Sequence, residues 1–246
     1  MIYPLPANQH FFRITITGRR WRDVLSGKGA FYLPVTGNRY NVILQQATYV
    51  SDSLAVAVTE WAYYVARDWQ DRIGKHAAIP ITGPLVSEAI LWQFTIQTPN
   101  YVVDAESLAA SLPWPAHVLL NPSGNYAATQ HLANLALSRP FPGYTPPHPG
   151  LKVPAVRSRL QTAATESNFV FFRMGKSPTG QLVGKWRLQI EFLDPAGNEV
   201  TATTVRVDWS QFRFRLLQPL GSFPAGQPSP AGYSATSWYP LALNHL

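Results

Sequence analysis

Hydrophobic and polar residues alternate along several short segments of the chain, which is the pattern of β-strands with one buried face. These segments are also rich in β-branched and aromatic residues, the types that strands favour. Pro113 and Pro115 restrict one of them to a sheet edge or a strand start, because proline has no backbone N–H to donate. We therefore predict strands at residues 11–17, 43–50, 88–97, 115–121 and 168–174.

Two segments have the spacing of helices instead. From residue 54 onwards apolar residues recur every three or four positions, which predicts an amphipathic helix over 54–73. The polar triplet Ser51-Asp52-Ser53 comes directly before it and is typical of a helix N-cap. A second helix is predicted over 126–138, with Asn125 as its cap.

The order of these elements indicates the fold class. Strands and helices do not alternate strictly, which argues against a doubly wound parallel sheet and favours an α+β fold. Residues 182–193 and 200–209 alternate on either side of a turn-forming Asp-Pro-Ala-Gly-Asn-Glu segment. That arrangement predicts a C-terminal β-hairpin over about 182–209.

The chain after Arg215 contains no Lys, Arg, Asp or Glu but several prolines and aromatic residues. A free tail of that kind would leave large apolar rings in water. We therefore predict an ordered, extended strap over 216–246 that lies along the domain or a neighbouring subunit. Residues 1–215 then form one domain.

Composition narrows the function. The chain has 246 residues, a net charge of +7 and no cysteine, which excludes disulfides, thiolate nucleophiles and Cys-ligated metals. The six histidines form no metal-binding spacing, and phosphate-loop, dinucleotide-binding and serine-hydrolase motifs are absent. The N-terminus does not have the pattern of a secretion signal, and no apolar stretch is long enough to cross a bilayer. We expect a cytoplasmic protein.

Four residues near the front of the chain combine charge with aromatic character: Arg13, Arg39, Tyr49 and Glu60. Taken one at a time they indicate nothing special. Glu60 at the edge of an apolar helix face is usually a boundary residue with its carboxylate in water. Arg39 between two asparagines is usually a surface residue, and a tyrosine such as Tyr49 is more often part of the core.

Together, and in this order, these residues resemble the RES domain family, which is named for its Arg, Glu and Ser. The similarity rests on Phe12-Arg13, the loop Gly37-Asn38-Arg39-Tyr40-Asn41, Tyr49, and a helix that starts Ser53-Leu54-Ala55 and carries Glu60. Later segments that match the family's second half are Tyr126 to Ala133 and Gly150-Leu151-Lys152-Val153-Pro154. The resemblance covers about residues 11–174.

The resemblance implies an ADP-ribosyltransferase-like α+β fold with mixed β-sheets, and a toxin that consumes NAD by hydrolysis or phosphorolysis. It implies Glu60 and Arg39 as catalytic residues, with Glu60 stabilising an oxocarbenium-like state. Arg39 and Arg13 would bind phosphate or ribose oxygens, and Tyr49 would stack on the cationic nicotinamide. Tyr40 stands where the family usually has Trp. No cofactor is implied beyond NAD as the substrate.

The family serine is the main departure. A gapless alignment puts Ala155 at its position, so Ser158 would be the catalytic serine only if the local register differs. Two other functions therefore stay open: ADP-ribosyl transfer to a macromolecule, and a degenerate basic binding module on the same fold. The expected partners are NAD and a cognate antitoxin, without a membrane or nucleic acid. Three points stay open: which molecule accepts the ADP-ribosyl group, which protein is the antitoxin, and whether the chain forms a homo-oligomer.

Overall fold

The structure, a computed structural model, is organised around one mixed β-sheet. It describes residues 1–15, 39–40, 42, 45, 47–62, 86–98, 100–113, 126–155, 166–172, 180–193, 211–219, 229–230, 233–234 and 237–242. Within these residues ten strands follow one another in the order β1-β5-β6-β7-β3-β2-β4-β8-β9-β10. They are β1 (Ile2–Leu5), β2 (His10–Thr15), β3 (Ala47–Ser51), β4 (Val86–Ile96), β5 (Asn100–Asp104), β6 (Gly150–Pro154), β7 (Ser167–Phe172), β8 (Gly180–Leu193), β9 (Gln211–Pro219) and β10 (Tyr239–Ala242).

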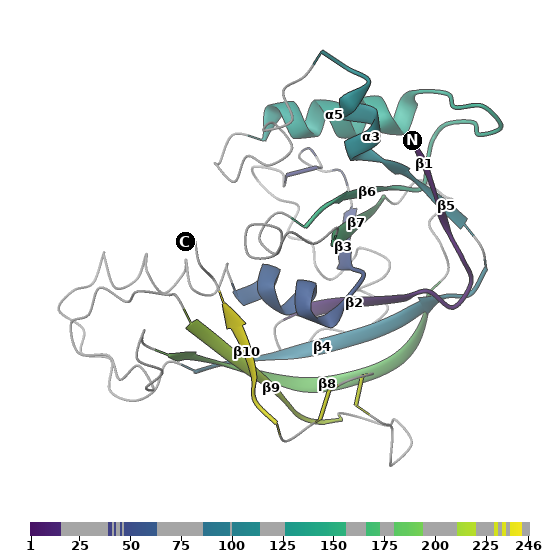
Figure 1. The fold of residues 1–246 in the computed structure, drawn as a ribbon. Coiled ribbons are helices and arrows are strands. Elements are labelled where there is room, and N and C mark those ends of the chain that lie inside the picture. Colours follow the sequence, from purple (N-terminus) through teal and green to yellow (C-terminus); the bar gives the residue numbers. More distant parts are fainter. Residues whose placement is uncertain are drawn as a thin grey trace.

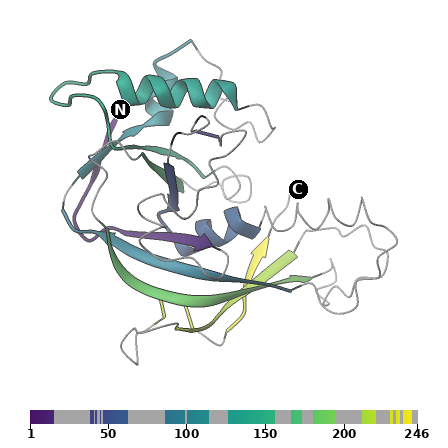
Figure 2. The ribbon, with the colours of Figure 1, turned by 180° about the vertical axis from the view of Figure 1, so that it is seen from behind.

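The sheet divides into two halves where β2 meets β3. These two strands share a single register pair, Phe12 with Ser51, whereas the other antiparallel pairs in the sheet are longer. Figures 1 and 2 show the consequence: β1, β5, β6, β7 and β3 form one half, and β2, β4, β8, β9 and β10 curve away as the other. The helix at residues 54–62 lies between the two halves.

Each half has a hydrophobic core on the side of its helix or helices, and a third cluster, which includes Phe11, Phe94 and Phe169, contains residues of both halves. The helices α3 (Ala105–Ala110) and α5 (Ala127–Ser138) cover the first half, and Leu132, Ala133 and Ala136 of α5 pack on its strands. The helix at residues 54–62 packs on the second half, with its buried apolar residues against those of β4, β8 and β9. No helix among the described residues is long and apolar enough to cross a membrane. The α+β class predicted from the sequence is confirmed.

The predicted N-cap of the first helix is confirmed, with Ser53 as the capping residue. The Ser53 hydroxyl oxygen accepts the backbone N–H of Val56 at 3.2 Å, which satisfies one of the first helical donors. Helical structure is described for residues 54–62, and the predicted continuation to residue 73 lies outside the described residues.

The second helix, α5, begins at Ala127, one residue later than predicted. The N-cap of α5 is Tyr126, without a side-chain hydrogen bond, so Asn125 as the cap is wrong. The reason is in the backbone: the carbonyl of Tyr126 accepts the N–H of Gln130 at 2.9 Å and so makes the first intrahelical bond.

Three of the predicted strands match β2, β4 and β7, and the strand predicted over 43–50 is shorter than expected. The side chain of Gln45 accepts the backbone N–H of Val42, and β3 starts at Ala47. Residues 43, 44 and 46 lie outside the described residues. The strand predicted over 115–121 lies outside the described residues.

The hairpin partner of β8 differs from the prediction. Strand β8 pairs antiparallel with β9, from Leu193 opposite Gln211 to Trp186 opposite Pro219. Its other edge pairs with β4, so both edges of its central part are occupied. The second strand of the hairpin is therefore Gln211–Pro219. The predicted partner segment 200–209 lies outside the described residues.

The described part of the chain after Arg215 lies on the sheet. Strand β9 continues across the expected domain boundary to Pro219, and β10 pairs antiparallel with β9. The Tyr239 ring lies 5.4 Å from Phe214 and 4.7 Å from Tyr233, centroid to centroid. Burial raises the pKa of Tyr233, and the nearby Tyr239 and Glu166 add to that rise.

We predict that Tyr239→Ala destabilises the protein by about 2 kcal/mol, because it removes a ring that packs on the core of the second half. Thermal and denaturant unfolding would measure the loss. Tyr239→Phe is the matched control: it keeps the ring, loses the hydroxyl that accepts the Ser234 N–H, and should cost about 1 kcal/mol or less. Equal stability of Tyr239→Ala and the unmodified chain would show that β10 contributes nothing to the fold.

Candidate functional site

A cavity of about 350 Å³ lies where the two halves of the sheet meet. Its walls come from strands β2, β3, β6 and β7, from the helix at residues 54–62, from the Arg39-Tyr40 segment and from the residue that caps α5. The lining residues are Phe12, Arg13, Ile14, Arg39, Tyr40, Tyr49, Val50, Ser51, Ala57, Glu60, Trp61, Tyr126, Val153, Pro154 and Asn168.

The floor of the cavity is a row of residues that runs across four strands. Val153 of β6 lies opposite Asn168 of β7, Asn168 lies opposite Ser51 of β3, and Ser51 lies opposite Phe12 of β2. Because opposite residues in a ladder project to the same face, the strand register brings these four side chains together. Tyr49 is two residues before Ser51 and therefore lies on the same face, in the next row.

Glu60 enters the cavity from the helix. The Ser53 cap fixes where this helix starts, and its buried residues Ala57 and Val58 hold it on the core of the second half. The Oε1 atom of Glu60 accepts a hydrogen bond from Nδ2 of Asn168 at 3.0 Å. The carboxylate is thus tied to the cavity floor across the junction between helix and sheet.

The backbone around Arg39 is held by two separate elements. The Tyr49 hydroxyl of β3 accepts the backbone N–H of Tyr40 at 3.0 Å, and the Thr129 hydroxyl of α5 contacts the carbonyl oxygen of Arg39. Tyr40 is buried, and the guanidinium carbon of Arg39 lies 5.6 Å from the centroid of its ring. This loop segment is therefore fixed at the cavity by contacts on both sides.

The convergence expected from the sequence is confirmed. Arg39, Tyr49 and Glu60 line one cavity although they come from a loop, a strand and a helix, and Tyr40 and Arg13 border the same space. Arg13 is on β2, where its register partner is Trp92. Ser158 lies outside the described residues. The roles of these side chains in binding or catalysis stay predictions.

The lining residues that were not predicted as site residues include three with a hydroxyl or amide group: Ser51, Tyr126 and Asn168. Ser51 was assigned only to the helix cap, and Tyr126 only to a helix. Asn168 carried a signal that could have been used, because it is a polar residue at the start of an otherwise apolar strand, Asn168 to Phe172. Its importance comes from long-range strand pairing, which local patterns do not contain.

The register around Ala155 is continuous. Strand β6 pairs with β7 without a shift as far as Pro154, and the N–H of Ala155 bonds to the carbonyl of Glu166 at 3.2 Å, which continues the ladder. Ala155 is fully buried, and alternation returns it to the face that carries Val153. A methyl group therefore stands at the end of the strand, at the position where the resemblance led us to expect the family serine.

The charges and rings of the cavity suit a ligand that carries both anionic oxygens and a positive centre. Among the described residues the charged lining side chains are Arg13, Arg39 and Glu60, and Tyr40, Tyr49, Trp61 and Tyr126 supply aromatic rings. Guanidinium groups bind phosphate and carboxylate oxygens, and ring faces attract cations. The described part of the chain contains no cluster of His, Asp or Glu that could hold a metal ion.

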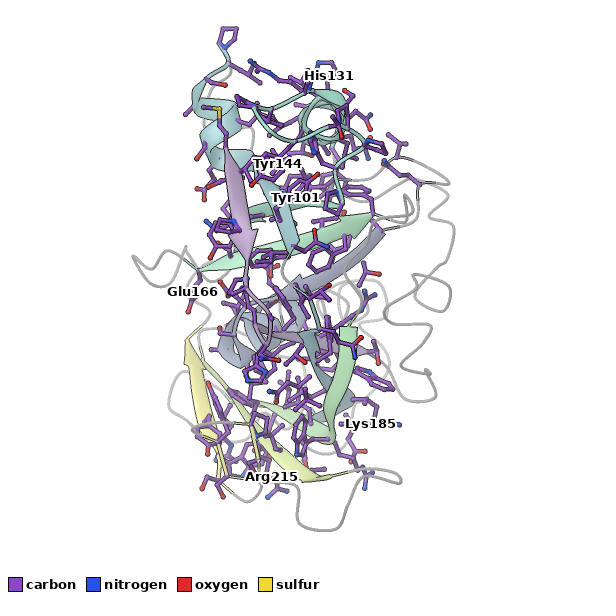
Figure 3. All side chains as sticks on the ribbon, turned by 90° about the vertical axis from the view of Figure 1, so that its right-hand side faces the viewer. Tyr101, His131, Tyr144, Glu166, Lys185 and Arg215 are labelled. Atoms are coloured by element: carbon purple, nitrogen blue, oxygen red, sulfur yellow. The ribbon has the colours of Figure 1, made fainter. Side chains whose placement is uncertain are left out.

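Figure 3 locates this region relative to the two ends of the molecule. Tyr101 and Tyr144, whose ring centroids lie 4.4 Å apart, are at the end with α3 and α5, and Lys185 and Arg215 are at the opposite end with β8 and β9. Glu166, which directly precedes β7, lies between them on one side. The cavity-lining residue Asn168 follows it in that strand.

One comparison with known proteins identifies a family. A family model described as "RES domain" matches residues 7–191, well over half of the chain. A comparison with curated proteins finds no match. Among solved structures, the crystal structure of the M. tuberculosis MbcT-MbcA toxin-antitoxin complex aligns with 74% of this chain and 85% of its own, at 16% sequence identity and a TM-score of 0.47.

We predict that Tyr49→Phe loosens the Arg39-Tyr40 segment, because the N–H of Tyr40 loses the hydroxyl that accepts it. A hydrogen bond of this kind contributes about 1 kcal/mol to the free energy of unfolding. Hydrogen exchange should show faster exchange at the Tyr40 amide. The control is Tyr101→Phe, whose hydroxyl contacts Nδ1 of His148 at 3.3 Å in the half-sheet under α3 and α5. Unchanged exchange at Tyr40 in Tyr49→Phe would contradict the account of this loop.

Proposed function

This chain belongs to the RES domain family, and from that premise we propose that it is the toxin of a toxin-antitoxin system and cleaves the nicotinamide-ribose bond of NAD. The observation that carries the proposal is the convergence of Glu60, Arg39 and Tyr49 around one cavity. A carboxylate, a guanidinium and an aromatic ring are the groups that this reaction needs. No cofactor is proposed beyond NAD as substrate.

Glu60 is proposed as the group that stabilises the transition state. When the bond between nicotinamide and ribose breaks, positive charge develops on the ribose ring, as it does in glycoside hydrolysis. A fixed carboxylate at that position lowers the barrier because it interacts more strongly with the transition state than with the substrate. The hydrogen bond from Asn168 supports this role, since it holds the carboxylate in one position.

The other cavity residues are proposed to bind and orient NAD. Arg39 offers planar, paired donors for a phosphate or ribose oxygen, and Arg13 is proposed as a second phosphate contact. Tyr49 is proposed to face the cationic nicotinamide ring, with Tyr40 completing the aromatic wall. The cavity volume of about 350 Å³ is near the lower end for ligand pockets. We therefore expect it to hold the nicotinamide-ribose part of NAD rather than the whole molecule.

Two acceptors give two balanced reactions. With water, NAD is converted to ADP-ribose, nicotinamide and a proton. With inorganic phosphate, the phosphate oxygen bonds to the ribose carbon that nicotinamide leaves, which gives a phosphorylated ADP-ribose and nicotinamide. Transfer to a macromolecule is the corresponding reaction with a protein or nucleic acid nucleophile.

A second candidate function is a binding module that has lost the reaction. The observation that favours it is the fully buried Ala155, which continues the β6 ladder where the aligned family pattern has serine. Ser158, the alternative serine, lies outside the described residues. The net charge of +7 is compatible with such a module, since it would attract an acidic partner.

A cognate antitoxin is proposed as the protein partner, because a cell that makes an NAD-consuming enzyme needs a way to restrain it. We expect the antitoxin to obstruct the cavity or to hold the Arg39-Tyr40 segment away from Glu60. Action in the cytoplasm, where NAD is available, belongs to the same proposal.

We predict that Glu60→Gln lowers NAD turnover by about 10²-fold or more, because it removes a charge that opposes the oxocarbenium-like state but keeps the volume. Purified protein would be incubated with NAD, with and without phosphate, and the products separated by chromatography. Glu106→Gln is the control, since Glu106 lies in the first turn of α3 and does not line the cavity.

The product pattern decides between the candidates. Nicotinamide release that depends on phosphate identifies phosphorolysis, and release without it identifies hydrolysis. If the unmodified protein releases no nicotinamide, the binding module is favoured. If Glu60→Gln and the unmodified protein react at the same rate, Glu60 is a bystander.

A further inference from the structure

We propose that Asn168, itself held by Ser51, is a positioning residue that fixes the carboxylate of Glu60. The catalytic consequence rests on the proposed function, but the positioning itself is independent of it. Three side chains form a continuous hydrogen-bonded series: Oγ of Ser51 donates to Oδ1 of Asn168 at 2.7 Å, and Nδ2 of Asn168 donates to Oε1 of Glu60 at 3.0 Å.

The amide of Asn168 has only one orientation that satisfies both neighbours. An ionised carboxylate can only accept hydrogen bonds, so the side of the amide that faces Glu60 must be the NH₂ group. The amide oxygen then faces Ser51, whose hydroxyl can donate to it. The carboxylate of Glu60 therefore sets the orientation of the amide, and the Ser51 hydroxyl holds Asn168 in it by donating to the amide oxygen.

The backbone under this series is rigid. Asn168 pairs with Ser51 of β3 on one side and with Val153 of β6 on the other, so its position is fixed by ladders on both edges. Next to it, the N–H of Ser167 bonds to a carboxylate oxygen of Asp52 at 3.3 Å, directly before the Ser53 cap. The start of the helix that carries Glu60 is thus tied to the same strand that carries Asn168.

These contacts hold the Glu60 carboxylate in one position at the cavity floor. Glu60 has a flexible side chain on a helix that packs on one half of the sheet, whereas the cavity floor belongs largely to the other half. If the side chain had to become ordered during the reaction, the activation barrier would be higher. A carboxylate that is already held in position avoids this increase. A hydrogen bond to the ionised form also favours the ionised carboxylate.

The first test replaces Asn168 in two ways. Asn168→Ala removes the donor, and Asn168→Asp keeps the shape but places a second carboxylate beside Glu60. We expect kcat for NAD cleavage to fall by about 10- to 100-fold in Asn168→Ala, with a smaller change in KM. Asn100→Ala is the matched control, because it removes another strand asparagine whose side chain bonds to a backbone N–H away from the cavity.

The second test follows the Glu60 carboxyl directly and does not need NAD. With ¹³C-labelled glutamate, NMR would record its titration, and Glu60→Gln would assign the signal. Both Asn168 variants should shift the midpoint for Glu60 to higher pH, and Asn168→Asp should shift it further, because the ionised form loses its donor or gains a like charge. The other titratable groups that line the cavity stay the same in every variant: Arg13, Arg39, Tyr40, Tyr49 and Tyr126.

The third test asks whether Ser51 acts through Asn168. Ser51→Ala should reduce kcat by a smaller factor than Asn168→Ala, and the double variant should be no slower than Asn168→Ala alone. Residues that act as one unit give such non-additive effects, whereas two independent structural contributions would multiply.

The outcomes are separable. A Glu60 midpoint that stays unchanged in both Asn168 variants overturns the proposal, and so does a change in KM alone, which would make Asn168 a direct ligand contact. If the unmodified protein cleaves no NAD but the midpoint shifts as expected, the proposed function fails and the positioning role stands. Multiplicative rates in the double variant would overturn the role of Ser51.

Discussion

The site depends on how two halves of one sheet are joined. Strands β2 and β3 share a single register pair, Phe12 with Ser51. On the cavity side the strands of the two halves pack into different cores, and a third core contains residues of both halves. A long ladder at this point would have kept the sheet continuous and left no space above it. Because the junction is so short, a cavity can open there, and both cores contribute side chains to it.

Contacts that cross this junction must then keep the cavity in shape. The series from Ser51 through Asn168 to Glu60 is one such contact. The bond from the Ser167 N–H to Asp52 supports it, because it ties β7 to the residue before the Ser53 cap of the helix. On the far side, the Tyr49 hydroxyl holds the Tyr40 backbone. Side chains on strands that are fixed by their ladders thus hold the polar groups that the helix and the loop carry.

Sequence patterns predicted the elements of the site better than their assembly. The spacing of apolar residues predicted the helix that carries Glu60, and the Ser53 cap was correct because capping is a local interaction. The hairpin partner of β8 was wrong because strand pairing is decided by which edges are free, and that is a property of the whole sheet. Asn168 was missed for the same reason, since its neighbours Ser51 and Glu60 are more than a hundred residues away in sequence.

The C-terminal part of the chain extends the sheet beyond the segment that the family model matches. Strands β9 and β10 follow residue 191, and the guanidinium carbons of Arg213 and Arg215 lie 4.6 and 4.5 Å from the ring of Trp238. Arg213 also pairs with the buried carboxylate of Glu191. These two guanidinium groups are therefore engaged within the fold. Fewer positive charges are available to bind an acidic partner than the net charge of the chain suggests.

We propose that NAD reacts in the cavity between the two half-sheets. A crystal structure of Glu60→Gln with NAD bound tests it most directly, because this variant should bind the substrate without consuming it. We expect the nicotinamide-ribose bond of the bound NAD to lie beside residue 60. Arg39 should contact a phosphate or ribose oxygen, and Tyr49 should face the nicotinamide ring. NAD bound at another surface, or in the cavity with its adenine end beside residue 60, would contradict it.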